Sequence, residues 1–256
     1  MPELVRLERV AAVGIVSLNR PPVNVLNRAV LDALDEVLRQ VGHDPDIRAI
    51  VLTGGDRAFS AGADIREFGS LIDSTEIREW MTRGHSVISG MARMRKPLIA
   101  AIEGYCFGGG LEVALGCHLR CAGESAELGL PEIKLGIVPG FGGTQRLPRL
   151  IGAANATRMM LTGDPVTGAR ALDMGLVDQL VPTGEARASA IALAEVLSQR
   201  STTATSMILD LVEAAADMPL SEGLSREIEA EVRAVRSEDG REGIAAFLAK
   251  RAARFN

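Results

Sequence analysis

Short apolar runs alternate with amphipathic stretches over the first 150 residues, and this alternation limits the folds that the chain can adopt. The runs 47–55 and 97–104 have the length of buried strands, and each ends in glycine. The stretches 27–44 and 74–96 carry apolar residues at the spacing of a helix. Residues 5–22 have the pattern of two more short strands that end at a proline pair. Strands that alternate with helices predict an α/β fold.

The C-terminal part differs in character. Residues 153–163 and 166–175 have helical patterns, and beyond Thr183 almost every segment does. Helices with apolar stripes need a surface that covers those stripes, either on the core of the same chain or on another subunit. We therefore predict a core over residues 1–195 and a C-terminal helical region over residues 196–256.

Composition and charge disfavour several classes of partner. The chain has 256 residues, a formal net charge of −5 and only three lysines, which disfavours a broad basic face for nucleic acid or an anionic membrane. The N-terminal residues lack the apolar core of a secretory signal, and no apolar run reaches the length of a membrane span. We predict a cytoplasmic protein with neither nucleic acid nor membrane as a partner.

The three cysteines do not indicate a disulfide framework, because they are few and odd in number. Cys117, His118 and Cys121 have a spacing that superficially resembles a zinc motif, but Cys106 is the only further candidate ligand nearby. The surrounding run is apolar. We therefore predict buried thiols in a strand rather than a metal site.

Three consecutive glycines, Gly108 to Gly110, lead from a strand pattern into an apolar helix. A helix start presents unpaired backbone N–H groups, and glycine lets a ligand approach them closely. Such a site suits a phosphate or a developing oxyanion. The pattern matches neither G-x-G-x-x-G nor the P-loop, which disfavours a phosphate cradle. Close packing of strand against helix explains the triplet equally well.

A second turn of small residues, 60–63, also follows a strand and precedes a helical stretch. Asp64 at the start of that stretch fits a helix N-cap. The same turn exposes a second backbone N–H, however, which can point toward the first. Two converging N–H groups form an oxyanion hole, which neither forms alone.

Two glutamates lie beside glycine-rich turns. Glu112 is in the first helical turn after the glycine triplet, and Glu132 follows Pro131 at the start of a predicted short helix, with a further glycine-rich turn at 139–143. Each position also suits an acid that simply interacts with the helix dipole. Both glutamates have apolar neighbours, where burial raises a carboxyl pKa, and two such groups around one pocket can divide acid and base roles.

Long segments of the chain, in order, resemble the crotonase (enoyl-CoA hydratase/isomerase) superfamily from about residue 4 to the C-terminal residues. They are FSAGADI at 59–65, GYCFGGGLEVAL at 104–115, LPEIKLGIVPGFGGTQRLPRLIG at 130–152, TGDPVTGARALDMGLVDQLVP at 162–182 and EGIAAFLAKRAARF at 242–255. The resemblance implies an α/β fold, namely a crotonase-like spiral of ββα units with a C-terminal helical trimerisation region. It also implies homotrimers, which often pair into hexamers.

The resemblance further implies an acyl-CoA substrate whose thioester oxygen is polarised by the backbone N–H groups of Ala63 and Gly109. Hydratases of this kind carry two glutamates, which match Glu112 and Glu132. Glu112 would be the principal base for a water, Glu132 would deliver a proton to C2, and the Gly140 amide would orient the water. The implied reaction is hydration of 2-enoyl-CoA in fatty-acid and acyl-CoA degradation. It needs no metal and no redox cofactor, because coenzyme A is part of the substrate.

Position in the matching motifs also implies residues that contact substrate, although a solvated surface charge explains each basic one equally well. Those expected around coenzyme A are Arg57, Ala61, Ala63, Asp64, Ile65, Arg66, Gly109 and Lys250, with Lys250 reaching the CoA of a neighbouring subunit. Those expected along the acyl channel are Phe68, Leu71, Trp80 and Met81, for which plain core packing is the alternative. Phe107 and Phe141 are bulky for their positions and are expected to shape the pocket.

Other functions stay open at this stage. Double-bond isomerisation, or dehydration of a specialised hydroxyacyl-CoA, would start from the same enolate. A non-catalytic CoA- or RNA-binding scaffold is disfavoured by the acidic composition and by the intact pair of glutamates. A hydrolase triad is disfavoured because the chain has no G-x-S-x-G and its three histidines have no obvious serine partner.

Overall fold

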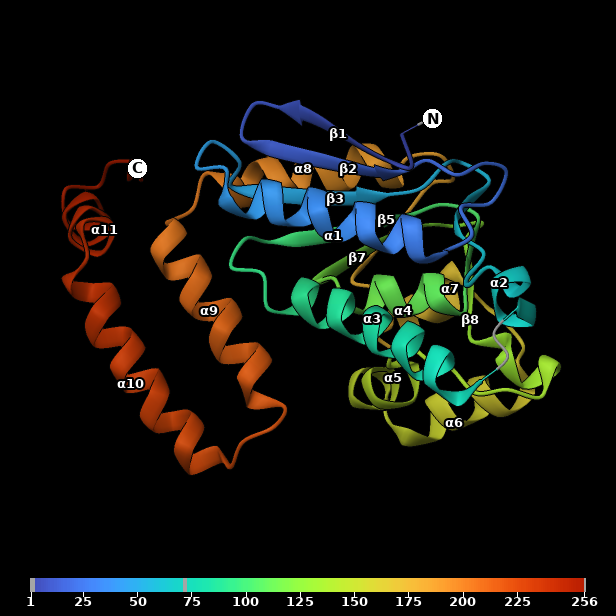
Figure 1. Ribbon diagram of the computed structural model, residues 1–256. Coiled ribbons are helices and arrows are strands. Elements are labelled where there is room, and N and C mark those ends of the chain that lie inside the picture. The colour runs from blue at the N-terminus through green and yellow to red at the C-terminus, as the bar shows by residue number, and fades with distance from the viewer. Residues whose placement is uncertain (1–2, 71–72, 256) are drawn as a thin grey trace.

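The computed structural model describes residues 3–70 and 73–255 and contains two β-sheets with helices packed around them (Figure 1). The larger sheet has the strand order β1-β2-β3-β5-β7-β10. β1 and β2 form an antiparallel hairpin, and all later neighbours in this sheet are parallel. The strands are β1 (Val5–Val10), β2 (Val13–Leu18), β3 (Ala49–Thr53), β5 (Leu98–Ile102), β7 (Leu119–Gly123) and β10 (Gln179–Val181).

The smaller sheet has the order β4-β6-β8-β9. Its strands are β4 (Ala58–Ser60), β6 (Tyr105–Phe107), β8 (Glu127–Gly129) and β9 (Val166–Thr167). Each of β4, β6 and β8 follows a strand of the larger sheet along the chain and precedes a helix. This repeated order of strand, strand and helix is the ββα spiral that the resemblance implied, and the predicted α/β fold class is confirmed.

The two faces of the larger sheet are buried by different helices. α1 (Arg28–His43) and α3 (Ser74–Ala92) lie on one side, whereas α8 (Ala186–Ser198) lies on the other (Figure 1). Side chains of a strand alternate between the faces, so the apolar residues of β3 and β5 fall into two separate core clusters. Both strands are buried along their whole length, as their continuous apolar runs predicted.

Several predicted boundaries need correction. α3 ends at Ala92, four residues before the end of the predicted stretch 74–96. The predicted helix at 166–175 begins with a strand instead, because residues 166–167 pair antiparallel with β8 and only α7 (Gly168–Asp173) is helical. Local pattern alone does not show this long-range pairing.

The remaining helices carry the chain to its end. α2 (Ile65–Ser70), α4 (Gly109–Leu115), the 3₁₀-helix η1 (Pro131–Leu135), α5 (Gly143–Ile151) and α6 (Ala153–Thr162) surround the smaller sheet, whereas α9 (Thr202–Ala215), α10 (Leu220–Arg236) and α11 (Glu238–Leu248) extend away from it (Figure 1). The predicted division at 195/196 lies within α8, whose buried alanines pack on the larger sheet.

Candidate active site

Three neighbouring strands of the smaller sheet bring the predicted site together. β4, β6 and β8 are parallel, and they end at Ser60, Phe107 and Gly129. The chain then turns into α2, α4 and η1, respectively. Because the carboxyl ends of parallel strands meet at one edge of a sheet, the residues that follow the three strands become neighbours although they are far apart in sequence.

The backbone nitrogens of Ala63 and Gly109 lie close to each other at this edge. A Cβ added to Gly109 would be 3.4 Å from the Ala63 nitrogen, and one added to Gly62 would be 3.4 Å from the Gly109 nitrogen. In residues 3–70 and 73–255, neither N–H donates to a protein acceptor. The fold thus brings together the two donors predicted as an oxyanion hole, whose role in binding stays a prediction.

Glu112 lies in the first turn of α4 with a side chain held by a distant loop. Glu112 is 1% exposed. The carboxylate Oε1 accepts hydrogen bonds from the backbone nitrogens of Phe141 and Gly143, each at 2.7 Å. A Cβ on Gly143 would lie 3.0 Å from the same oxygen, so glycine at this position leaves the space that the carboxylate occupies.

The pKa of Glu112 is raised from 4.5 to about 7, with burial as the largest cause. The charge of Glu132 raises the pKa further, and the hydrogen bonds from Gly143 and Phe141 oppose the increase because they stabilise the carboxylate. A carboxyl group with a pKa near 7 exchanges protons readily at neutral pH, which suits a general acid or base.

Glu132 lies in η1, directly after Pro131, and faces the start of α4. A Cβ on Gly108 would be 3.0 Å from its Oε1, and Gly108 itself has a φ of +51°, which glycine adopts readily. The other oxygen, Oε2, is buried and has no hydrogen-bond partner among the described residues. Burial raises the pKa of Glu132 as well. This oxygen is therefore available to a water or to a substrate proton.

Both glutamates and both backbone donors line one cavity of about 490 Å³. The predicted acyl-channel residues Trp80 and Met81 line it, and so does Phe141. Leu71 and the side chain of Phe68 fall outside the described residues. The other apolar residues of the wall include Ile77, Leu135, Ile137 and Val138. A larger cavity, about 740 Å³, lies between α1, α3 and α9 and is lined by neither glutamate.

The residues expected to bind coenzyme A separate into two groups. Ala61 and Ile65 line the cavity together with the backbone donors. Arg57 is exposed outside the cavity, and the Arg66 side chain is 86% exposed. The single chain does not bring these two cations to the cavity wall, so their contact with CoA stays a prediction.

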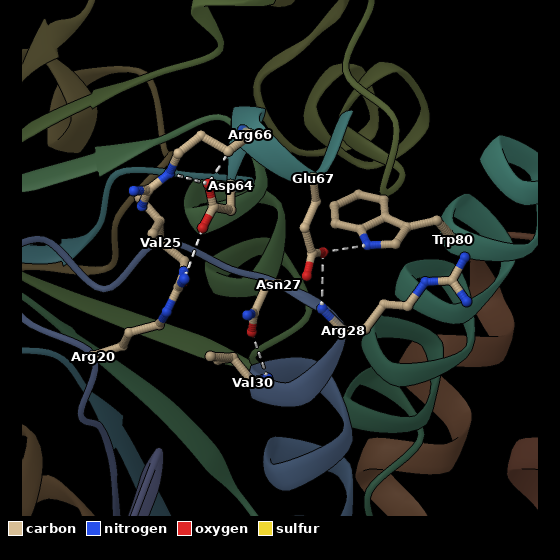
Figure 2. Close-up of polar contacts among 9 residues, drawn as sticks. All are labelled: Arg20, Val25, Asn27, Arg28, Val30, Asp64, Arg66, Glu67 and Trp80. Atoms are coloured by element: carbon tan, nitrogen blue, oxygen red, sulfur yellow. Dashed lines mark hydrogen bonds and ion pairs between the residues drawn. The ribbon is translucent and has the colours of Figure 1, made fainter. Parts of the chain in front are cut away.

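Asp64 is buried and forms ion pairs with two arginines. It is 6% exposed, its Oδ2 is 2.7 Å from Nη2 of Arg20, and its Oδ1 is 3.2 Å from Nε of Arg66 (Figure 2). The hydrogen bond from Arg20 is the main reason that the pKa of Asp64 lies below its usual value. The pair ties the start of α2 to the segment that follows β2. Asp64 was expected near CoA, but it does not line the cavity.

Two other predicted residues have different positions. Gly140 lies in the cavity wall, where the Met81 sulfur occupies the space that a side chain at 140 would need. Lys250 is exposed and follows α11, which lies on the opposite side of the molecule from α2 in Figure 1. A contact between Lys250 and substrate therefore requires a second subunit.

Sequence reasoning missed the groups that hold the site in place. The N–H donors of Phe141 and Gly143 have no side-chain pattern, and only the glycine-rich turn at 139–143 hinted at them. Arg20, which pairs with Asp64, follows a strand and was not singled out. Its position directly before a proline pair was the one available indication of an ordered turn.

The cysteines are all buried and free. Cys121 lies in β7 and Cys106 in β6, whereas Cys117 precedes β7, so the predicted location in a strand is wrong for Cys117. His118 accepts a hydrogen bond at Nδ1 from the Leu98 N–H. Within the described ranges, no cluster of three histidine, cysteine or acidic side chains could hold a metal ion. No helix there is long and apolar enough to span a membrane.

Two backbone donors beside one buried and one partly buried carboxyl group, in a largely apolar cavity, form an arrangement that suits acid–base chemistry on a polarised carbonyl. The family model for enoyl-CoA hydratase/isomerase matches residues 8–256. The chain is 41% identical over 244 residues to a probable enoyl-CoA hydratase from Bacillus subtilis, with 95% of each chain covered.

Two solved structures are also similar to this chain over nearly its whole length. An enoyl-CoA hydratase from Geobacillus kaustophilus has a TM-score of 0.96 and 32% identity, with 100% of this chain and 97% of that chain covered. DspI from Pseudomonas aeruginosa has a TM-score of 0.95 and 37% identity, with 99% and 97% covered. The chain belongs to the enoyl-CoA hydratase/isomerase family, and the resemblance inferred from the motifs is confirmed.

Proposed function

We propose that this chain is an enoyl-CoA hydratase that adds water reversibly across the 2,3 double bond of 2-enoyl-CoA thioesters. The observation that carries the proposal is the joint placement around one cavity of Glu112, Glu132 and two backbone donors that have no acceptor among the described residues. Similarity to proteins named as enoyl-CoA hydratases supports it. We further propose a role in fatty-acid or related acyl-CoA degradation.

The backbone donors would act on the thioester oxygen. Water addition at C3 produces an enolate, whose negative charge develops on that oxygen. Fixed N–H groups of Ala63 and Gly109 stabilise this charge without having to reorient, and loss of one such donor typically costs about 3 kcal/mol in the barrier. Polarisation of the thioester also makes C3 more electrophilic.

The two carboxyl groups would handle the protons. Glu112, with a pKa near neutrality, takes the proton of the attacking water, and Glu132 delivers a proton to C2. The Gly140 amide is proposed to orient the water. Hydration changes no oxidation state of the substrate as a whole, so we propose that no redox cofactor or metal takes part and that coenzyme A enters only with the substrate.

The test is loss of the conjugated thioester absorbance of crotonyl-CoA, followed by longer 2-enoyl-CoAs. Glu112→Gln and Glu132→Gln should each lower kcat by about 10²- to 10⁴-fold. Glu36→Gln, which changes an exposed glutamate on α1, is the matched control and should keep wild-type kcat. Wild-type protein that hydrates none of these substrates would refute the proposal, and faster turnover of a 3-enoyl-CoA would assign isomerisation instead.

We also propose that the chain assembles as a homotrimer, or as a hexamer of two trimers, in the cytoplasm. The C-terminal region is proposed as residues 196–256. α9 buries no residue, and α10 and α11 bury one alanine each. Large apolar side chains on these helices, such as Ile208, Val212 and Phe247, are exposed. A second copy would cover them, because exposed apolar area of this kind marks interfaces. Sedimentation at micromolar concentration tests the assembly, and a monomer would refute it.

Coenzyme A would be contacted by the basic residues near the site. We propose that Arg57 and Arg66 interact with its phosphates and that Lys250 does so from a neighbouring subunit. Ala61, Ile65 and the segment that ends at Asp64 would contact the rest of the cofactor moiety through the main chain. Replacement of each cation by alanine should raise KM while kcat stays within about 2-fold, since a surface charge contributes little beyond binding.

A further inference from the structure

The Phe141 side chain fills a space that two glycines leave open. Phe141 is 2% exposed, and its ring lies between Gly84 in the interior of α3 and Gly109 at the start of α4. A Cβ on Gly84 would overlap the ring at Cδ1, and one on Gly109 would be 3.2 Å from Cδ2 on the opposite edge. The Trp80 ring packs on Phe141 with a centroid separation of 4.5 Å. We call Trp80, Gly84 and Gly109 the Phe141 seat.

The seat is anchored on its outer side. Trp80 donates from Nε1 to Oε2 of Glu67 at 3.1 Å, and the same oxygen accepts from the Arg28 backbone nitrogen at 3.2 Å (Figure 2). Glu67 lies in α2, which begins two residues after Ala63, and Arg28 is the first residue of α1. Trp80 therefore connects the ring of Phe141 to α2, which follows the turn that carries the Ala63 donor.

The backbone of Phe141 holds the base. Its N–H donates to Oε1 of Glu112 at 2.7 Å, and the Gly143 N–H donates to the same oxygen. Only Cβ and Cα separate the ring from this nitrogen. Because both edges of the ring are in contact, a displacement of the ring must move the backbone as well and change how the N–H meets Glu112.

Gly84 is unfavourable for the helix in which it lies. A glycine in a helix interior costs about 1 kcal/mol relative to alanine. α3 contains a second interior glycine, Gly90, which is exposed and has nothing within 4 Å of an added Cβ. Alanine fits at 90 and clashes at 84. The helix thus contains a residue of low helix propensity at the position where the Phe141 ring needs the space.

We propose that the Phe141 side chain, held in its seat of Trp80, Gly84 and Gly109, is a positioning residue that fixes Glu112 through the Phe141 backbone N–H. This inference rests on the proposed hydratase function with Glu112 as base. The size of the residue at 84 and the size of the residue at 141 are then coupled, and a change at 84 affects the reaction only through the Phe141 ring.

The test is a double-mutant cycle with Gly84→Ala, Phe141→Ala and the combined variant, assayed on crotonyl-CoA. Gly84→Ala should lower kcat by at least ~10-fold, because a displacement of about 1 Å at reacting groups can cost as much as 10²-fold. KM should change by less than ~3-fold, since Phe141 presents almost no surface to substrate. In the Phe141→Ala background, the same Gly84→Ala change should have little effect on kcat.

Two controls separate positioning from packing. Gly90→Ala makes the same substitution in the same helix without a clash and should leave kcat and KM unchanged. The acid limb of the kcat/KM profile should move to higher pH in Gly84→Ala, because a displaced N–H donor no longer stabilises the Glu112 carboxylate. Phe141→Leu adds no clash and serves where Gly84→Ala folds poorly; it should also lower kcat by ~10-fold with KM retained.

Equal losses from Gly84→Ala with and without the Phe141 ring would overturn the proposal, as would an unchanged acid limb or an unchanged kcat in Phe141→Leu. Wild-type and Gly90→Ala proteins are assayed first. If both are inactive on every 2-enoyl-CoA, the proposed function is wrong, and this inference fails as well because it rests on that function. If both are active and Gly84→Ala matches them, only the positioning role fails.

Discussion

Glu112 should make the folded chain less stable as the pH rises from 4.5 to about 7. Burial raises the pKa of Glu112 from 4.5 to about 7, so within this window the unfolded chain releases the proton while the folded chain keeps it. The folded state then binds more protons than the unfolded state, and the free energy of unfolding falls with rising pH. The loss begins near pH 4.5 and is complete above about pH 7.

The size of the change in the free energy of unfolding follows from the shift of the Glu112 pKa. One pKa unit corresponds to about 1.4 kcal/mol, so the change from 4.5 to about 7 corresponds to about 3 kcal/mol. Glu112→Gln removes the charge and retains an oxygen for the N–H groups of Phe141 and Gly143. The variant should therefore gain about 3 kcal/mol over wild type between pH 4.5 and about pH 8.

The assay is urea unfolding followed by fluorescence of Trp80, which is the only tryptophan in the chain and is buried. All samples need the same protein concentration, because assembly makes stability concentration-dependent. Glu36→Gln, at an exposed position, should show no comparable change with pH. A free-energy difference between wild type and Glu112→Gln that is the same at both pH values would refute the claim that burial of Glu112 destabilises its charged form.

Three further outcomes are expected. Gly108→Ala should lower kcat by at least ~10-fold, because its φ is +51° and an added Cβ would crowd the second glutamate; Gly55→Ala, with open space around it, is the control. The kcat/KM for crotonyl-CoA should rise with pH to a plateau with its midpoint near pH 7, since Glu112 acts as a base only when ionised; a flat profile would contradict this role. Arg20→Gln should lower the free energy of unfolding by about 2 kcal/mol at neutral pH, because it leaves the buried Asp64 carboxylate without its main partner. Urea unfolding measures this change, and midpoints that stay within error of wild type would show that Arg66 or water compensates.

Elements whose burial follows from an amphipathic spacing or a continuous apolar run were predictable from local pattern. α1 begins after Asn27, whose side chain accepts from the Val30 N–H, and its apolar spacing matches the residues that it buries. β3 and β5 needed only their continuous apolar runs. β9 was predicted as helix because its strand character comes from pairing with β8, which lies almost 40 residues earlier. Pairing over such distances overrides local propensity.

The candidate site residues could be singled out from the sequence for a related reason. The Ala63 and Gly109 donors and the two glutamates all follow strands of the smaller sheet, and the residues just before the two donors are Gly62 and Gly108, whose positive φ demands glycine. That demand is visible in the sequence. The contacts that hold Glu112 were not visible, because its donors lie 29 and 31 residues further along the chain and belong to the backbone, which every residue type possesses.

The role of a charged side chain could not be predicted from the sequence in the same way. Asp64 at a helix start fits an N-cap, a ligand contact and an ion pair equally well from sequence, and the structure shows the first and the third, because its Oδ1 accepts from the Arg66 N–H and its Oδ2 pairs with Arg20. The partner, Arg20, is 44 residues earlier and partly buried, whereas Asp64 is buried directly after Ala63. One short segment thus supplies the donor through its small residues and anchors itself through its acid. A charge beside a functional turn is therefore as well explained by holding the turn as by touching the ligand, and for Asp64 the ion pair with Arg20 favours the first role.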